Sequence, residues 1–269
     1  MQRQSLPERL RLRNRVLAPE LRGYAASRAS GTGEPLSLDS EAASIAPLVD
    51  VIQGNVYLVG HDYGAAVAFR LALARRERIA GLVLYEATLF SLLLADPGSR
   101  DAAMDIAVLR RVLRRHLDAG DWFRAALRYV EHWSGRDAWQ RLSTPQRAAI
   151  AWRMPELCAR LDATLADPTH LSVYAAIDLP VLLLSATRTR ASTGRIAQLL
   201  ARTLPRAEWH TVDGAGLRGI DSHPEAVERE IEAFLARHQW HRDPEPTGFF
   251  ALPAFAYRQR GTGHGQWKS

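Results

Sequence analysis

The stretch VYLVGHDYGAAVAF, residues 56–69, joins two apolar segments through a turn that has a glycine on each side of an acid. The first segment is typical of a buried strand and the alanine-rich second segment is typical of a helix. Gly60 and Gly64 let such a turn close without a Cβ clash. The pattern therefore predicts a strand, a sharp turn and a helix, with the side chain of Asp62 exposed at the carboxyl edge of a sheet.

Strands and helices are predicted to alternate on both sides of this stretch. We expect strands at 15–20, 56–60, 81–86, 180–185 and 208–212, and helices at 37–52, 65–76, 195–204 and 224–237. In the first helix Ser37 is the expected cap, and Ile45, Leu48, Val49 and Ile52 share one face. The alternation predicts an α/β fold with a mostly parallel sheet flanked by helices.

Residues 101–165 interrupt the alternation, because they show only helical periodicity and carry tryptophan at positions 122, 133, 139 and 152. We interpret them as a helical cap whose tryptophans pack over the sheet. The chain then divides into a first part of the core (1–100), the cap (101–165) and a second part of the core (166–238). Residues 239–269 are rich in Pro, Gly and aromatics without a period, which predicts a disordered tail.

Composition excludes several classes of function. The 35 basic and 29 acidic residues give a formal charge of +6, but arginine is dispersed, and the run at 110–115 has the spacing of a solvated helix face rather than of a nucleic-acid site. The longest apolar run, 80–95, contains Glu86 and is too short to span a membrane. One cysteine, Cys158, and no leader sequence predict a cytoplasmic protein. We expect no cofactor and no metal.

From about residue 6 to residue 236 the chain resembles the α/β-hydrolase superfamily. The landmarks are RVLAPELRGYAAS (15–27), the turn at Asp62, RIAGLVLYEATLF (78–90), YVEHWSG (129–135), LPVLLLS (179–185) and LPRAEWHTVDGAGLRGIDSHPEAV (204–227). Most members carry Ser at the turn, whereas a turn with Asp at this position resembles that of haloalkane dehalogenases and epoxide hydrolases. The resemblance implies a capped α/β-hydrolase fold and a small apolar molecule in a pocket under the cap. It also implies that Asp62 attacks carbon to form an ester, and that the Tyr63 backbone N–H is an oxyanion donor.

The rest of the family's machinery is incomplete. The family's catalytic histidine follows the last strand, where this chain has Leu217, and His210 and His223 are poor substitutes. The stretch 185–190, where the triad acid is usual, has no carboxylate. Glu86 matches an alternative acid position, but of its two possible roles we favour a local hydrogen-bonding role over that of the acid.

The strand and His-Gly loop that supply a second oxyanion donor in the family have no counterpart near the start, where residues 1–14 suggest a helix. That strand would lie between the strands at 15–20 and 56–60, so the fold is expected to lack its first strands. Three explanations are open: the two strands pair directly, another chain supplies the strand, or the sequence is part of a longer reading frame, which we favour. An open sheet edge would make an oligomer possible.

Three functional hypotheses follow. The first is an active hydrolase that uses Asp62 on an epoxide, haloalkane or ester. The second, which we favour, is a degenerate and catalytically impaired member in which Asp62 caps the helix that follows it. The third is an interaction protein on the same scaffold.

Overall fold

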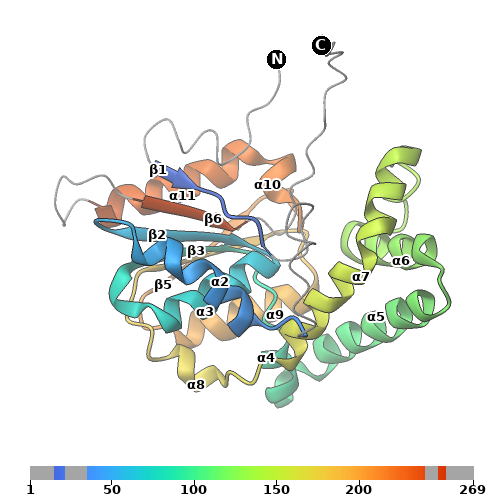
Figure 1. Cartoon of the computed structure of the whole chain (residues 1–269), viewed down its shortest axis with the longest axis horizontal. Helices are drawn as coiled ribbons and strands as arrows, with labels where there is room; N and C mark the ends of the chain where they lie inside the picture. Colours follow the sequence, from blue (N-terminus) through green and yellow to red (C-terminus); the bar gives the residue numbers. More distant parts are fainter. Residues whose placement is uncertain (1–14, 22–34, 240–247, 253–269) are drawn as a thin grey trace, which may run out of the picture.

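The computed structural model describes residues 15–21, 35–239 and 248–252. In these residues one sheet is covered by helices on both faces, and a group of three long helices stands beside it (Figure 1). The sheet has the order β1-β6-β2-β3-β4-β5, and every neighbouring pair is parallel. This confirms the predicted α/β fold with its parallel sheet.

The strands of the sheet are β1 (Arg15–Leu17), β2 (Val56–His61), β3 (Ile79–Tyr85), β4 (Val181–Ala186), β5 (Ala207–Val212) and β6 (Gly248–Leu252). Every residue of β2 and of β4 is buried, as continuous apolar strands of a two-sided parallel sheet should be. In β5 only Val212 is buried. The strand lies at the sheet's edge, and its partial exposure agrees with that place.

Strand β6 corrects two predictions. Residues 239–269 were expected to be disordered, but Gly248–Leu252 form a strand and α11 extends to Gln239. Strand β6 lies between β1 and β2 and pairs with both, so that Phe250 is opposite Leu17 on one side and Leu58 on the other. The chain's own C-terminal region therefore occupies the position of the missing strand. The backbone groups of β2 gain partners without direct pairing of β1 and β2 and without a second chain.

Helices α2 (Leu38–Asp50), α3 (Tyr63–Ala74) and α9 (Ala191–Thr203) pack on one face of the sheet. Helix α11 (Pro224–Gln239) covers the other face. Ser37 and Ser40 form a capping box that begins α2, as predicted for Ser37. Ile45 and Val49 are buried, but Leu48 is 41% exposed and is not a core residue. Ile52 is buried after the helix has ended.

The cap consists of α5 (Arg100–Asp118), α6 (Trp122–Ser134) and α7 (Thr144–Ala166). Its tryptophans differ in their contacts and in their exposure. Trp122 packs edge-to-face on Trp152 with ring centroids 5.3 Å apart, yet Trp152 is 64% exposed. Trp133 stacks on Phe90, which lies just before α4 (Ser91–Ala95), and Trp122 and Trp139 also pack against the hydrophobic core. The remaining short helical elements are Arg76–Arg78, Pro97–Ser99, α8 (Leu171–Tyr174) and α10 (Gly219–Ser222).

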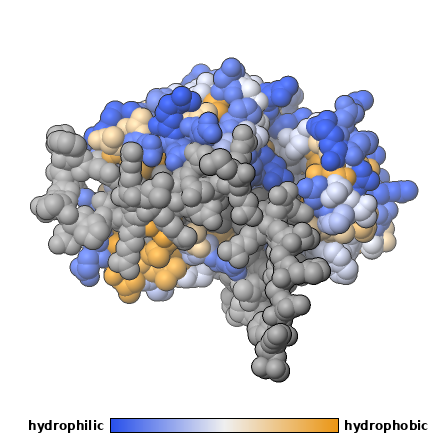
Figure 2. Space-filling model, turned by 90° about the horizontal axis from the view of Figure 1, so that it is seen from above, coloured by the Kyte–Doolittle hydropathy of each residue, from blue (hydrophilic) through white to orange (hydrophobic). Residues whose placement is uncertain are grey.

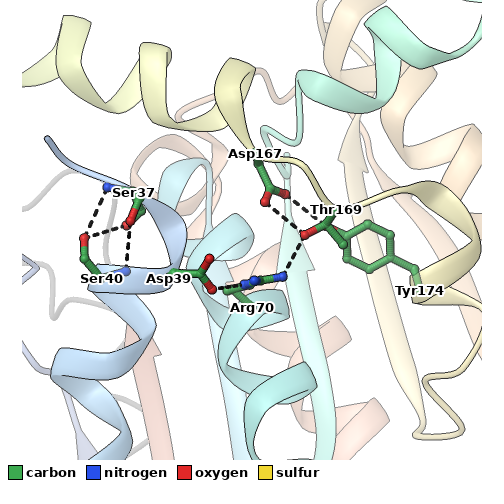
Figure 3. A network of polar contacts seen from close by, with 7 residues as sticks. All are labelled: Ser37, Asp39, Ser40, Arg70, Asp167, Thr169 and Tyr174. Atoms are coloured by element: carbon green, nitrogen blue, oxygen red, sulfur yellow. Dashed lines mark hydrogen bonds and ion pairs between the residues drawn. The ribbon is translucent and has the colours of Figure 1, made fainter.

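A polar network anchors the end of the cap to the core (Figure 3). Arg70 of α3 forms an ion pair with Asp39 of α2, and its Nη1 donates to Oγ1 of Thr169 at 2.7 Å. Thr169 in turn donates to Asp167, 2.9 Å away, and the Tyr174 hydroxyl donates to the same carboxylate at 3.4 Å. Since Asp167 directly follows α7, this network fixes the point at which the chain returns from the cap to the core.

The described surface is mostly hydrophilic on the face drawn in Figure 2, and its apolar side chains form separate patches. Within the described part of the chain, no helix combines the length and the apolar character that crossing a membrane requires.

Candidate active site

The turn between β2 and α3 has the strained geometry that the sequence predicts. Asp62 has φ 53° and ψ −121°, a conformation that non-glycine residues rarely adopt. Its N–H donates to the carbonyl of Tyr85 at 3.0 Å, and its own carbonyl accepts from the N–H of Ala65 at 3.1 Å. A Cβ at Gly60 would lie 2.6 Å from the Cα of Ala65, so glycine is required there. Hydrogen bonds to β3 and to α3 hold this strained conformation, which places Asp62 at the carboxyl edge of the sheet.

The carboxyl group of Asp62 has a raised pKa. Desolvation raises its pKa from 3.8 to about 6, while the Thr88 hydroxyl, the charge of Arg160 and the Tyr63 N–H act in the opposite direction. Burial disfavours the charged form of an acid, which accounts for the direction of the shift. Asp62 makes no N-cap hydrogen bond to α3. The only support for the capping role weighed for it is the N–H of Tyr63, the first residue of α3, which lowers the pKa of the carboxyl group.

Asp62 lines a cavity between the sheet edge and the cap with a volume of about 30 Å³, close to the share of one water molecule in the liquid. Apolar and aromatic side chains form most of its wall, with polar groups from Asp62, Thr88, Arg160 and Thr164. The full lining is Asp62, Tyr63, Thr88, Phe90, Leu109, Tyr129, Trp133, Leu157, Arg160, Leu161 and Thr164. Only the smallest ligand enters without movement of the cap.

Tyr63 is the first residue of α3, so its N–H belongs to the helix N-terminus, next to the cavity. Its side chain is buried beneath the cap, and the guanidinium carbon of Arg160 lies 5.1 Å from the ring centroid. Tyr63 therefore connects the turn to the cap through its side chain. Its backbone N–H faces the Asp62 carboxylate closely enough to lower the pKa of that group.

Glu86 follows β3 and accepts hydrogen bonds from the end of β4, from the start of α9 and from the loop between them. Its carboxylate accepts from the N–H of Ala186 at 2.7 Å and from the hydroxyls of Thr193 (2.8 Å) and Thr189. Burial raises its pKa despite these donors. It does not line the cavity with Asp62. These contacts tie the end of β3 to the loop between β4 and α9, and in the described residues no histidine contacts this carboxylate.

The loop that carries Leu217 lies between β5 and α10. The imidazole Nε2 of His61 lies 2.6 Å from the Leu217 carbonyl oxygen, and the Tyr85 hydroxyl donates to the Gly216 carbonyl at 2.7 Å. Burial lowers the pKa of His61 to about 4, so its neutral ring donates through Nε2 to this carbonyl. The ends of β2 and β3 thus bind the loop's backbone, but the side chain at this position is leucine.

The two histidines considered as substitutes lie elsewhere. His210 pairs with Glu230 of α11 through Nδ1 at 2.7 Å, and His223 contacts the Ser222 hydroxyl at 2.8 Å. In the part of the chain that the structure describes, no histidine lines the Asp62 cavity. Nor do the described residues contain a group of three His, Cys, Asp or Glu side chains arranged to hold a metal ion.

Sequence reasoning missed Thr88 and Arg160. Thr88 lies two residues beyond Glu86, in a stretch that was already quoted. Arg160 is only 3% exposed and lies between Leu157 and Leu161 on α7. A charged residue among apolar neighbours on the inner face of a cap helix is the signal that could have found it.

A sequence model described as the alpha/beta hydrolase family matches residues 3–230. The chain belongs to the α/β-hydrolase family. Among solved structures, a hydrolase from Pseudomonas aeruginosa superposes with a TM-score of 0.61 and 22% identity, covering 80% of this chain and 77% of that chain. A thermophilic esterase from Thermogutta terrifontis gives a TM-score of 0.59 and 22% identity, covering 84% and 90%. At these identities the likeness shows the fold alone.

A curated relative is Lipase LipV from Mycobacterium tuberculosis. It is 31% identical over 131 residues, which are 48% of this chain and 43% of the relative. The aligned part thus spans well under half of that lipase, and the match carries no substrate to this chain.

Proposed function

We propose that this α/β-hydrolase family protein is catalytically impaired: Asp62 can form an ester with a substrate, and the step that hydrolyses the ester is lost. The observation that carries the proposal is the Leu217 loop. Its backbone is bound by His61 and Tyr85 at the ends of the central strands, yet it brings a side chain that cannot accept a proton.

The first chemical step needs only Asp62. One carboxylate oxygen attacks an electrophilic carbon, a C–O bond forms, and the bond to the leaving group breaks with its electron pair going to that group. The pKa of about 6 leaves Asp62 mainly ionised at neutral pH. In this proposal the backbone N–H of Tyr63 is the donor to the negative charge that develops.

The second step needs a base. Water must attack the carbonyl carbon of the Asp62 ester, and a neighbouring group must take the proton from that water. Leucine at position 217 cannot do so, and Glu86 already accepts hydrogen bonds from the end of β4 and from α9. The ester is therefore expected to accumulate.

Incubation with a panel of epoxides, haloalkanes and activated esters tests this proposal when intact mass and released product are followed together. We expect one adduct per chain, mapped to Asp62, and no more than one product molecule per enzyme. Product in large excess over enzyme would instead establish the active hydrolase. The absence of any adduct across the panel would show that Asp62 is not a nucleophile here.

A second candidate is a ligand-binding protein that uses the cavity under the cap without chemistry. The enclosed cavity lined by Phe90, Tyr129 and Trp133 favours it. In that case Asp62→Asn would keep full affinity for a bound ligand, and no adduct would form in the parent protein. A cytoplasmic location, and association through an edge of the sheet, remain predictions of the same proposal.

A further inference from the structure

A groove between α4, α5 and the last turns of α7 is separate from the Asp62 cavity. Its volume is about 910 Å³, which is enough for a drug-sized ligand. The three helices lie against one another where the cap joins the core (Figure 1). Among the described residues, none lines both the groove and the Asp62 cavity. The arginine run at 110–115, expected to be a solvated helix face, therefore also forms a wall of a ligand-sized groove.

The arginines of this wall differ in their partners. Nε of Arg110 lies 2.5 Å from Oδ1 of Asp162, and Arg114 forms an ion pair with the other oxygen of the same carboxylate. Arg111 and Arg115 line the groove as well, but within the described part of the chain no side-chain hydrogen bond or ion pair joins either of them to another residue. Two guanidiniums of the groove are therefore open to a ligand.

The charges in the groove do not balance. Four arginines and two acids, Asp118 and Asp162, line it, which leaves a net charge of +2. Arg111 and Arg115 are four residues apart on α5, so their like charges are neighbours on the helix surface and destabilise it. Helix stability does not explain this pair, whereas an anionic ligand does.

The groove is apolar at one end and basic at the other. Its apolar lining includes Leu94 of α4 together with Leu165 and Ala166 at the end of α7, where the chain returns to the core. The basic lining continues away from the core along α5 as far as Asp118, the last residue of that helix (Figure 1). Leu94 is 59% exposed, so an apolar group bound beside it would remove apolar surface from water.

We propose that this groove binds a small molecule in which a phosphate monoester is joined to an apolar group. Arg111 and Arg115 bind the phosphate, and the apolar group lies toward Leu94 and Leu165. A phosphate monoester carries about two negative charges at neutral pH, which matches the net charge of the groove. Its three terminal oxygens can accept from two guanidinium forks at once. This site involves no contact with Asp62 and goes beyond the proposed function.

Hexyl phosphate and hexanoate are a matched pair of probes, because they share an alkyl chain but differ in charge and in the number of oxygens. Isothermal titration calorimetry of the whole protein at pH 7.5 measures their affinities. We expect hexyl phosphate to bind at least tenfold more tightly than hexanoate. Arg111→Gln and Arg115→Gln should each weaken the binding of hexyl phosphate about ten- to a hundredfold. Equal affinity for the two probes, or unchanged affinity in both variants, would overturn the proposal.

Arg124→Gln is the control variant, because it removes the same charge from the cap at a residue that does not line the groove. It should keep the affinity of the parent protein, and an equal loss there would show only general attraction of anions. Without ligand, Arg111→Gln and Arg115→Gln should unfold at a temperature no lower than the parent protein, since each removes a like-charge neighbour. A lower unfolding temperature would assign the two arginines to holding the cap and would overturn the proposal.

The same chemical group occurs in soluble phosphate esters and in the headgroup of phosphatidic acid. Sedimentation with vesicles of phosphatidylcholine that contain phosphatidic acid separates these sources, with phosphatidylglycerol vesicles of equal surface charge as the control. Binding of hexyl phosphate without binding to vesicles identifies a soluble ligand, and preference for phosphatidic acid vesicles identifies a lipid. Either result upholds the phosphate site, and the loss of both overturns it. Neither measurement depends on whether Asp62 forms an adduct.

Discussion

The imidazole Nε2 of His61 lies 2.6 Å from the carbonyl oxygen of Leu217, so the residue before Asp62 binds the backbone of the loop that follows β5. The Tyr85 hydroxyl binds the preceding residue, Gly216, in the same way at 2.7 Å. The loop is therefore positioned by buried polar contacts that do not depend on the side chain at 217.

Asp62→Asn should make the protein more stable at neutral pH. Burial raises the folded-state pKa of Asp62 to about 6, from an ordinary value of 3.8. Folding favours the protonated form of this carboxyl group. Its contribution to stability is therefore fully present below about pH 4 and is lost as the pH rises through 6, where the buried group must ionise. The asparagine variant avoids that loss, which is about 2–3 kcal/mol at pH 7.

Urea denaturation of both proteins at pH 4.0 and pH 7.5 measures this difference. The advantage of Asp62→Asn should shrink toward zero at the lower pH. An advantage that is equal at both pH values, or a loss of stability at pH 7.5, would contradict the desolvated carboxylate described here.

Phe250→Pro should destabilise the sheet, because proline removes a backbone donor from the middle of β6. That residue is paired on both sides, with Leu17 and with Leu58. An acceptor left without its donor in the middle of a sheet costs about 1–3 kcal/mol. Phe250→Val, which keeps the N–H and suits a strand, is the matched control. Equal unfolding free energies for the two variants would mean that β6 does not complete the sheet.

Glu86→Ala should loosen the loop between β4 and α9. It leaves the Ala186 N–H and the hydroxyls of Thr189 and Thr193 without their acceptor. Glu86→Gln is the control, since it also removes the buried charge but keeps an acceptor oxygen. We expect the alanine variant to be less stable by about 1–3 kcal/mol and its Ala186 amide to exchange faster. Equal protection of that amide in the two variants would argue against the local role.

The parts of this fold and site that the sequence predicts are those set by neighbouring residues. The Asp62 turn follows from two glycines between an apolar strand and a helix, and the Ser37 cap follows from side chain to backbone contacts within one turn. These signals are local, and the structure confirms both the turn at Asp62 and the N-terminal capping of α2 by Ser37.

The parts that the sequence does not predict depend on contacts between distant residues. Strand β6 is five residues long, and its pairing with β1 and β2 joins opposite ends of the chain. Arg160 meets Tyr63 only because α7 lies across the start of α3. No pattern of neighbouring residues in the sequence predicts either of these contacts.

The most direct test of the central claim is the rate of product release by Leu217→His, with Leu217→Asn as a control of similar polarity that is a much weaker base. The reagent is whichever electrophile forms the Asp62 adduct in the parent protein. If the missing base alone stops the reaction, the histidine variant will release many product molecules per enzyme and its adduct will decay, while the asparagine variant stays alkylated. A persistent adduct in a well-folded Leu217→His protein would contradict the account.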